Sequence, residues 1–176
     1  GRRPDESANK PGEVFAPCAA AALYRRDIFL QAGGFDESYF CYFEDVDLAF
    51  RLRLQGHRCL YVPNAVVAHA GSASLGKHSG FSIYHGHRNL VWTYFKNMPW
   101  PMILFYLPQH IFFNVAALIW FSLIGHPKII FGAKWDALKG LSGVLKQRKE
   151  IQKKVKIPPD ALRGVMAKGW LQPFKR

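Results

Sequence analysis

Apolar and polar positions divide the chain into two regions of different character. In the first region, residues 43–55 predict a helix that ends at Gly56, since glycine readily takes the left-handed conformation after a helix end. Further on, the apolar run Ala65–Ala68 predicts a strand after the turn at Pro63–Asn64. In the second region, apolar residues become almost continuous and are then followed by a lysine-rich stretch.

The most apolar stretch runs from Met102 to Gly125 and is long enough to span a bilayer, which needs roughly 20 residues. Four residues interrupt it: Pro108, Gln109, His110 and Asn114. Basic residues flank both sides, and the positive-inside rule would keep both flanks in the cytoplasm. We therefore expect a re-entrant or in-plane anchor, broken near Pro108, rather than a single span. A buried pair of helices in a soluble protein is the alternative.

Charge is distributed unevenly between the two regions. The formal net charge is +12, and residues 1–125 contain 11 basic and 9 acidic side chains, whereas residues 126–176 contain 13 and 3. Residues 134–146 place lysines between apolar positions at helical spacing, which predicts a basic amphipathic helix. This asymmetry favours contact with an anionic membrane surface over a nucleic-acid partner, because DNA-binding proteins usually spread arginines over a folded recognition element.

Thiols and histidines offer little sign of a separate metal centre. Cys18, Cys41 and Cys59 lack metal-binding spacing and lie among apolar neighbours, so we expect free, buried thiols in a reducing cytosol. His85 and His87 are spaced as in some metal sites, but no cysteine or acid joins them. We expect no zinc site at this pair.

Carboxylates gather at the start of the predicted helix, where Glu44, Asp45 and Asp47 follow a run of aromatic residues. The positive end of the helix dipole keeps such acids ionised, so one of them can accept a proton. A plain structural role is the alternative, and Asp47 has the spacing of an ordinary helix ion pair with Arg51. Five aromatic residues before the acids suggest the wall of a cleft, which favours a functional site: Phe35, Tyr39, Phe40, Tyr42 and Phe43.

An ordered series of motifs resembles the C-terminal half of family 2 glycosyltransferases, in particular bacterial rhamnosyltransferase-like members. The series is GGFDE at 33–37, FEDVDLAFRLRLQG at 43–56, VPNAVVAHAGSAS at 62–74 and HRN at 87–89. These relatives are inverting enzymes, and the resemblance covers roughly residues 15–97. It implies an α/β fold, namely a partial GT-A (nucleotide-diphospho-sugar transferase) domain that lacks its N-terminal nucleotide-binding half and is followed by membrane-associated helices.

The resemblance also implies roles for the acids. Asp45 would be the catalytic base that takes the proton from an acceptor hydroxyl as its oxygen attacks the anomeric carbon of a nucleotide-sugar. A single displacement inverts that carbon, so one base suffices. Glu44 would orient the acceptor or the loop, whereas Asp47 is expected to pair with Arg51.

Further residues are implied for the donor side. His69 would help to bind a divalent cation, Mn²⁺ or Mg²⁺, that holds the donor diphosphate, although a lone histidine at a strand end often has only a structural role. Lys77 lies in a loop of small residues that would cover the diphosphate or serve as a plain connector. Arg88 is a possible phosphate contact, and Asp36 is included in the substrate-binding set.

Together these inferences predict inverting transfer from a nucleotide-sugar, such as a dTDP-rhamnose-like donor, to a lipid-linked or cell-surface glycan acceptor. We expect it at the cytoplasmic face of the bacterial inner membrane. No DxD-like motif precedes Cys18, so we expect part of a larger or split enzyme, inactive alone. A non-catalytic membrane-binding or scaffold module is the alternative. The expected divisions are 1–14 (polar leader or loop), 15–100 (acceptor and metal half), 101–125 (apolar segment), 126–157 (basic amphipathic helix) and 158–176 (tail).

Overall fold

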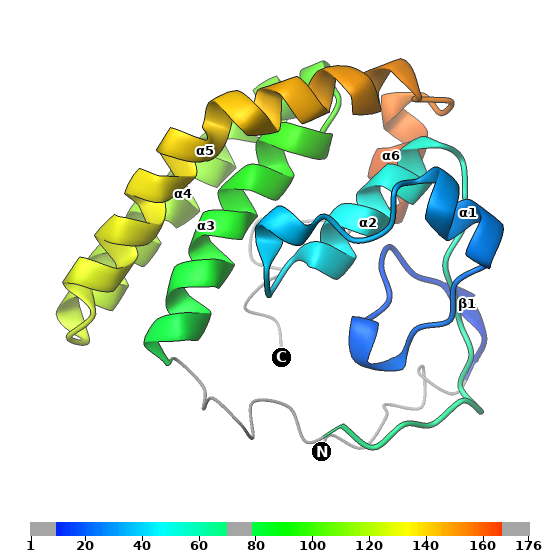
Figure 1. The fold of residues 1–176 in the computed structure, drawn as a ribbon, viewed down its shortest axis with the longest axis horizontal. Helices are drawn as coiled ribbons and strands as arrows, with labels where there is room; N and C mark the ends of the chain where they lie inside the picture. Colours follow the sequence, from blue (N-terminus) through cyan, green and yellow to red (C-terminus); the bar gives the residue numbers. More distant parts are fainter. Residues whose placement is uncertain (1–9, 70–78, 167–176) are drawn as a thin grey trace.

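Helices make up most of the computed structural model, which describes residues 10–69 and 79–166 (Figure 1). In chain order the elements are β1 (Gly12–Glu13), η2 (Ala19–Ala21), α1 (Arg26–Gln31), η3 (Glu37–Tyr39), α2 (Glu44–Leu54), β2 (Leu60–Tyr61), α3 (Gly80–Asn97), α4 (Trp100–Leu123), α5 (Pro127–Lys153) and α6 (Pro159–Val165).

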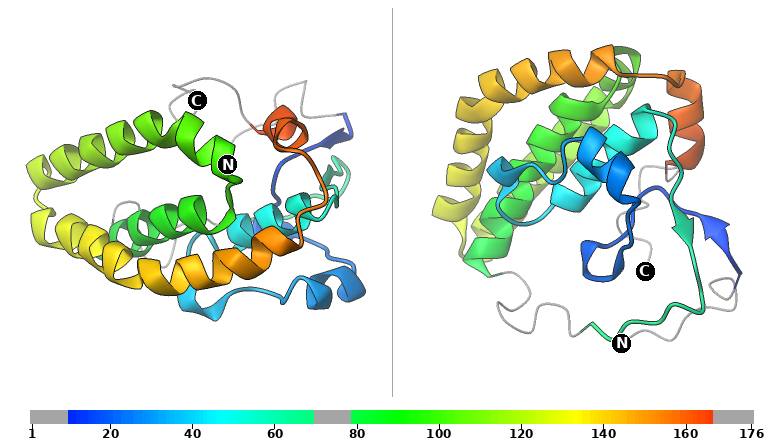
Figure 2. Two further views of the ribbon diagram at one scale, coloured as in Figure 1. Left: turned by 90° about the horizontal axis from the view of Figure 1, so that it is seen from above. Right: turned by 45° about the vertical axis from the view of Figure 1, so that its right-hand side comes forward.

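Three long consecutive helices form one side of the molecule, and α5 packs along α3 (Figure 2). Gly140 allows this close approach, because a Cβ atom there would lie 2.4 Å from the ring of Trp92. The Trp92 indole also donates to the carbonyl of Ala137 at 3.0 Å. The predicted amphipathic helix is thus α5, which turns its buried residues toward its neighbours: Ile130, Ala133, Ala137 and Val144.

A hydrophobic core joins α2 to the ends of the other helices. Phe50 and Leu54 of α2 are buried against residues from α3, α4 and α6: Tyr94, Met98, Met102, Ile103 and Leu162. The helix predicted at 43–55 is confirmed as α2, and Gly56 has the left-handed φ of 88° expected after its end. The core therefore fixes α2, and with it the three carboxylates of its first turn.

Strands are short in the part of the chain that the structure describes. There, β1 and β2 form one antiparallel pair, with Gly12 opposite Tyr61 and Glu13 opposite Leu60. The predicted strand at Ala65–Ala68 is wrong, because these exposed residues have no ladder partner and run as irregular chain. The polar leader predicted for 1–14 includes β1, which Glu13 anchors by ion pairs with Arg53 and Arg58. The α/β class of a GT-A domain stays a prediction.

The predicted break near Pro108 is also wrong, since α4 runs unbroken from Trp100 to Leu123. Polar side chains within the helix are satisfied locally instead of interrupting it. Asn114 donates to the carbonyl of His110 at 2.7 Å, and Ser122 donates to that of Leu118 at 2.6 Å. The His110 ring stacks on Tyr94 of α3, with centroids 3.9 Å apart. The polar side chains of this segment are thus accommodated within a continuous helix.

Helix α4 leaves most of its apolar surface uncovered. Among the described residues it is the one helix long and apolar enough to cross a membrane, and only 11% of its most apolar window is buried. Exposed side chains include Trp100, Leu104, Phe105, Ile111, Phe112, Ile119, Trp120 and Leu123. An exposed apolar surface of this kind marks an interaction site. The cysteines are unpaired as predicted, but none is buried, since Cys18 is exposed and Cys41 and Cys59 are half-buried.

Candidate active site

The first turn of α2 presents the candidate acids next to the short η2 segment. Asp45 is half-buried, and its Oδ2 atom accepts from the backbone N–H of Ala19 at 3.1 Å, while Oδ1 accepts from the N–H of Val46 at 2.8 Å. Each carboxylate oxygen has a second lone pair, so the group can still accept a proton from a bound hydroxyl. The group lies in the first turn of α2, at the positive end of the helix dipole.

Two neighbouring polar atoms are buried without a hydrogen-bond partner among the described residues. They are the Glu44 Oε2 atom and the Tyr24 hydroxyl. Burial raises the pKa of Glu44, and the charge of Asp45 raises it further. Burial also raises the pKa of Tyr24 to about 12, with contributions from the charges of Asp45 and Glu44. Because buried polar groups are normally paired, these atoms are available to a polar ligand beside Asp45.

The loop that leads into α2 is held in an uncommon backbone conformation. Phe40, Tyr42 and Phe43 have φ angles of 60°, 67° and 70°, in the region that side chains other than glycine rarely adopt. Such residues persist only where the surroundings impose the conformation, and they cluster at functional sites. Here they set the direction in which the chain enters α2, and so the positions of the acids in its first turn.

Arg88 and Asn89 of α3 impose that conformation. The fully buried Asn89 amide donates to the carbonyls of Tyr39, Cys41 and Tyr42, at 3.0, 2.8 and 2.8 Å. The Arg88 guanidinium donates to the carbonyls of Ser38 and Tyr39 and lies 4.3 Å from the ring centroid of Trp92. These contacts give Arg88 a structural role in this structure, and the phosphate contact stays a prediction.

A buried ion cluster ties α2 to α3 and to the glycine turn before the loop. The fully buried Asp47 accepts from Arg51 Nε at 2.9 Å, as its spacing predicted, and lies 2.8 Å from Lys96. Arg51 also donates to the carbonyls of Ala32 and Gly34. Lys96 bridges to Asp36 at 2.5 Å.

Asp36 therefore belongs to this ion cluster rather than to an open binding surface. Its side chain also accepts from Ser38 and caps η3. Burial alone would raise the pKa of Asp36, but hydrogen bonds from Lys96 and Ser38 outweigh it and lower the pKa to about 2. The carboxylate is thus charged and paired.

The predicted metal ligand does not join the acids in a metal-binding group. His69 is exposed, and within residues 10–69 and 79–166 no three His, Cys, Asp or Glu side chains come together to hold an ion. The described residues therefore do not by themselves fit a divalent cation. Lys77 lies outside the described residues.

The aromatic residues expected to form a cleft wall have separate roles. Tyr39 is fully buried, and its hydroxyl donates to Asp47 at 3.3 Å. Phe35 packs on Tyr24 and Phe29, whereas Phe40 is 75% exposed. Phe43 lines a pocket between α2 and α3. Sequence reasoning missed Tyr24 altogether, and no pattern around this residue points to a site.

Comparisons with known proteins find similarity to rhamnosyltransferases. N-acetylglucosaminyl-diphospho-decaprenol L-rhamnosyltransferase of two Mycobacterium tuberculosis strains is 53% identical over 55 residues, 31% of this chain and 18% of the relative. Rhamnosyltransferase WbbL of Escherichia coli is 49% identical over 47 residues, 26% of this chain and 18% of the relative. The matched regions thus span less than a fifth of these relatives. No solved structure matches significantly.

The family described as Glycosyltransferase like family 2 matches residues 5–97, slightly more than half of the chain. The match includes the η2 segment, the strained loop, the acids of α2 and the Arg88–Asn89 pair. The chain belongs to glycosyltransferase family 2.

Proposed function

We propose that this chain supplies the acceptor side of an inverting glycosyltransferase, with Asp45 as the general base. The observation that carries the proposal is the position of Asp45, at the first turn of α2 with one oxygen on the Ala19 amide. The names of the relatives, both rhamnosyltransferases, support glycosyl transfer.

The proposed reaction needs one proton transfer. Asp45 takes the proton of the acceptor hydroxyl while that oxygen forms a bond to the anomeric carbon of the donor. The bond from that carbon to the nucleoside diphosphate breaks at the same time, and the configuration inverts. Glu44 Oε2 and the Tyr24 hydroxyl, which lack hydrogen-bond partners among the described residues, would orient the acceptor by hydrogen bonds.

The exposed apolar surface supports an acceptor and a location at the membrane. A lipid-linked glycan is tethered to the membrane, and the exposed face of α4 together with the basic residues of α5 suits the cytoplasmic face of the inner membrane. A nucleotide-sugar such as a dTDP-rhamnose-like compound would be the donor. We propose a divalent cation for its diphosphate, with His69 as one ligand and further ligands from outside the described residues, which form no metal-binding group by themselves.

The test is the Asp45→Asn variant of the full-length protein that carries this chain, assayed for rhamnose transfer from dTDP-rhamnose to a lipid-linked N-acetylglucosamine acceptor. Loss of the base should lower kcat by about 10²–10⁴-fold and leave donor binding unchanged. Asp27→Asn is the matched control, since Asp27 also occupies the first turn of a helix but is exposed and paired with Arg25. Near-normal transfer by Asp45→Asn would show that another group is the base. A wild-type protein that binds membranes but transfers nothing would favour the scaffold alternative.

A further inference from the structure

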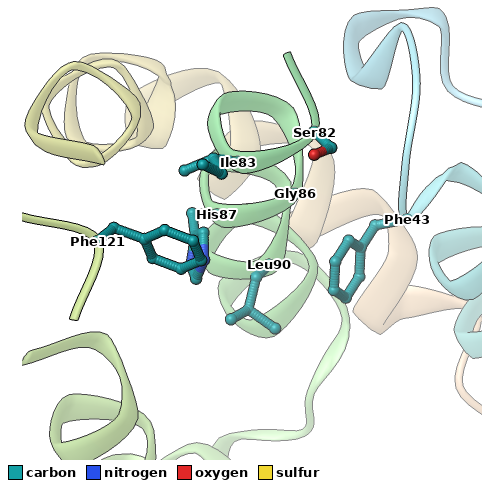
Figure 3. A pocket seen from close by; sticks show the side chains of 7 residues that line it. All are labelled: Phe43, Ser82, Ile83, Gly86, His87, Leu90 and Phe121. Atoms are coloured by element: carbon teal, nitrogen blue, oxygen red, sulfur yellow. The ribbon is translucent and has the colours of Figure 1, made fainter. Parts of the chain in front are cut away.

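An apolar pocket of about 240 Å³ opens beside the strained loop (Figure 3). Phe43 forms one wall, Gly86, His87 and Leu90 of α3 form the base, and Phe121 of α4 forms the opposite wall. Phe43 is the residue immediately before Glu44 and Asp45. The pocket therefore extends from the start of α2 to the apolar helix α4.

The walls of this pocket suit an uncharged, apolar occupant. Phenyl and aliphatic side chains line most of it, and the one ionisable group is the His87 imidazole, which packs edge-on against Phe121 at 4.9 Å. Burial, and to a lesser degree the charge of Lys134, lowers the pKa of His87 to about 4, so the ring is neutral at pH 7. Its Nδ1 atom has no hydrogen-bond partner among the described residues.

Size and position narrow the choice of occupant. Pockets for complete drug-sized ligands usually measure about 300–1,000 Å³, so this smaller one fits a segment of a longer molecule. Phe121 connects it to α4, whose exposed apolar surface is the face proposed to meet the membrane. A hydrocarbon chain that enters from the bilayer along α4 would thus reach Phe43, the residue that precedes the acid pair in the chain.

We propose that this pocket holds the polyprenyl segment of a lipid-linked acceptor and so places the sugar that it carries at Asp45. The inference rests on the proposed function and adds where the lipid is bound. A relative whose name includes a diphospho-decaprenol acceptor supports a polyprenyl chain as the occupant. A second copy of the chain or a peptide would need polar partners along its backbone, whereas Ser82 and His87 supply the only polar side chains among the seven residues that line this pocket.

Gly86 allows a sharp test, because a Cβ atom added there would meet nothing within 4 Å. Gly86→Leu should fill the pocket without a clash and should also favour the helix, since leucine is a better helix former than glycine. Gly143 of α5 is the matched control: it is an exposed helical glycine with the same open surroundings, outside the pocket. Circular dichroism should show both variants folded.

The probe is farnesyl phosphate bearing a diazirine, crosslinked to the full-length protein in nanodiscs, with labelled peptides identified by mass spectrometry. We expect labelling of the residues around Phe43 and Leu90, reduced about tenfold or more in Gly86→Leu and unchanged in Gly143→Leu, because about two methylene groups can no longer be buried. Excess unlabelled farnesyl phosphate should compete, and excess phospholipid should not.

Three outcomes would overturn the proposal: equal labelling in all three proteins, labelling confined to the outer faces of α4 and α5, and competition by bulk phospholipid. The crosslink needs no sugar transfer, so its outcome is separate from that of Asp45→Asn. Pocket labelling in a protein whose transfer does not depend on Asp45 would reject the proposed base and keep the lipid site. If transfer depends on Asp45 but the pocket is not labelled, the proposed base is kept and the lipid site is rejected.

Discussion

The substitution Asp47→Asn tests whether the buried ion cluster holds the site together. The change keeps the shape of the side chain but removes a charge that is fully buried. Lys96, whose side chain is 3% exposed, would then keep Asp36 as its carboxylate, whereas Arg51, 8% exposed, would have no carboxylate partner among the described residues. Removing one partner of a buried pair costs about 3–5 kcal/mol, out of a total stability of about 5–15 kcal/mol for a typical domain.

Urea unfolding, followed by circular dichroism, measures this loss as a shift in the midpoint at constant slope. We expect the free energy of unfolding to fall by about 3–5 kcal/mol for Asp47→Asn. The control Asp27→Asn removes an exposed pair and should leave the midpoint unchanged, because surface ion pairs contribute little. Adding Arg51→Met to Asp47→Asn removes the cation that has lost its carboxylate, keeps the Lys96–Asp36 pair and should recover part of the loss. A loss below about 1 kcal/mol, or no recovery in the double variant, would refute the reasoning.

Two further predictions concern Asn89, which binds the loop, and the carboxylate of Asp36. Asn89→Ala removes the donor to three carbonyls, so we expect a loss of about 2–3 kcal/mol of stability and faster hydrogen exchange in the first turn of α2. Unchanged exchange would mean that the loop keeps its conformation without Asn89. Because the pKa of Asp36 is lowered in the folded protein, its ionised carboxylate stabilises the fold above pH ~4. This stabilisation, up to about 2 kcal/mol, should be lost as the pH falls toward ~2, and urea unfolding at each pH measures the loss. Asp36→Asn should flatten that pH dependence, and a dependence equal to that of the wild type would contradict the assignment.

Sequence patterns predicted the elements whose causes are local. The helix with acids in its first turn, the glycine after its end and the Asp47–Arg51 pair depend on spacing within one turn or two, and all three are present. Patterns could not predict features that depend on contacts between distant segments. The unpaired hydroxyl of Tyr24 results from burial near Asp45, and the role of Asn89 results from α3 lying beside the loop.

Two predictions failed because the hydrogen-bond and packing partners of these residues outweigh their composition. Ala65–Ala68 has the composition of a strand but no neighbouring strand to pair with in the described structure. Pro108 and the polar residues near it suggested a break, yet Asn114 bonds back to its own helix and His110 stacks on Tyr94. Local propensity is a weak guide in both cases.

The aromatic loop has a consequence for anyone who wishes to move this site into another protein. Its shape is imposed by amide and guanidinium donors that arrive from about 50 positions later in the chain. Residues 33–56 would relax out of their left-handed angles if transplanted alone, and the carboxylates would point elsewhere. The smallest portable unit is that motif together with the turn of α3 that carries Arg88 and Asn89.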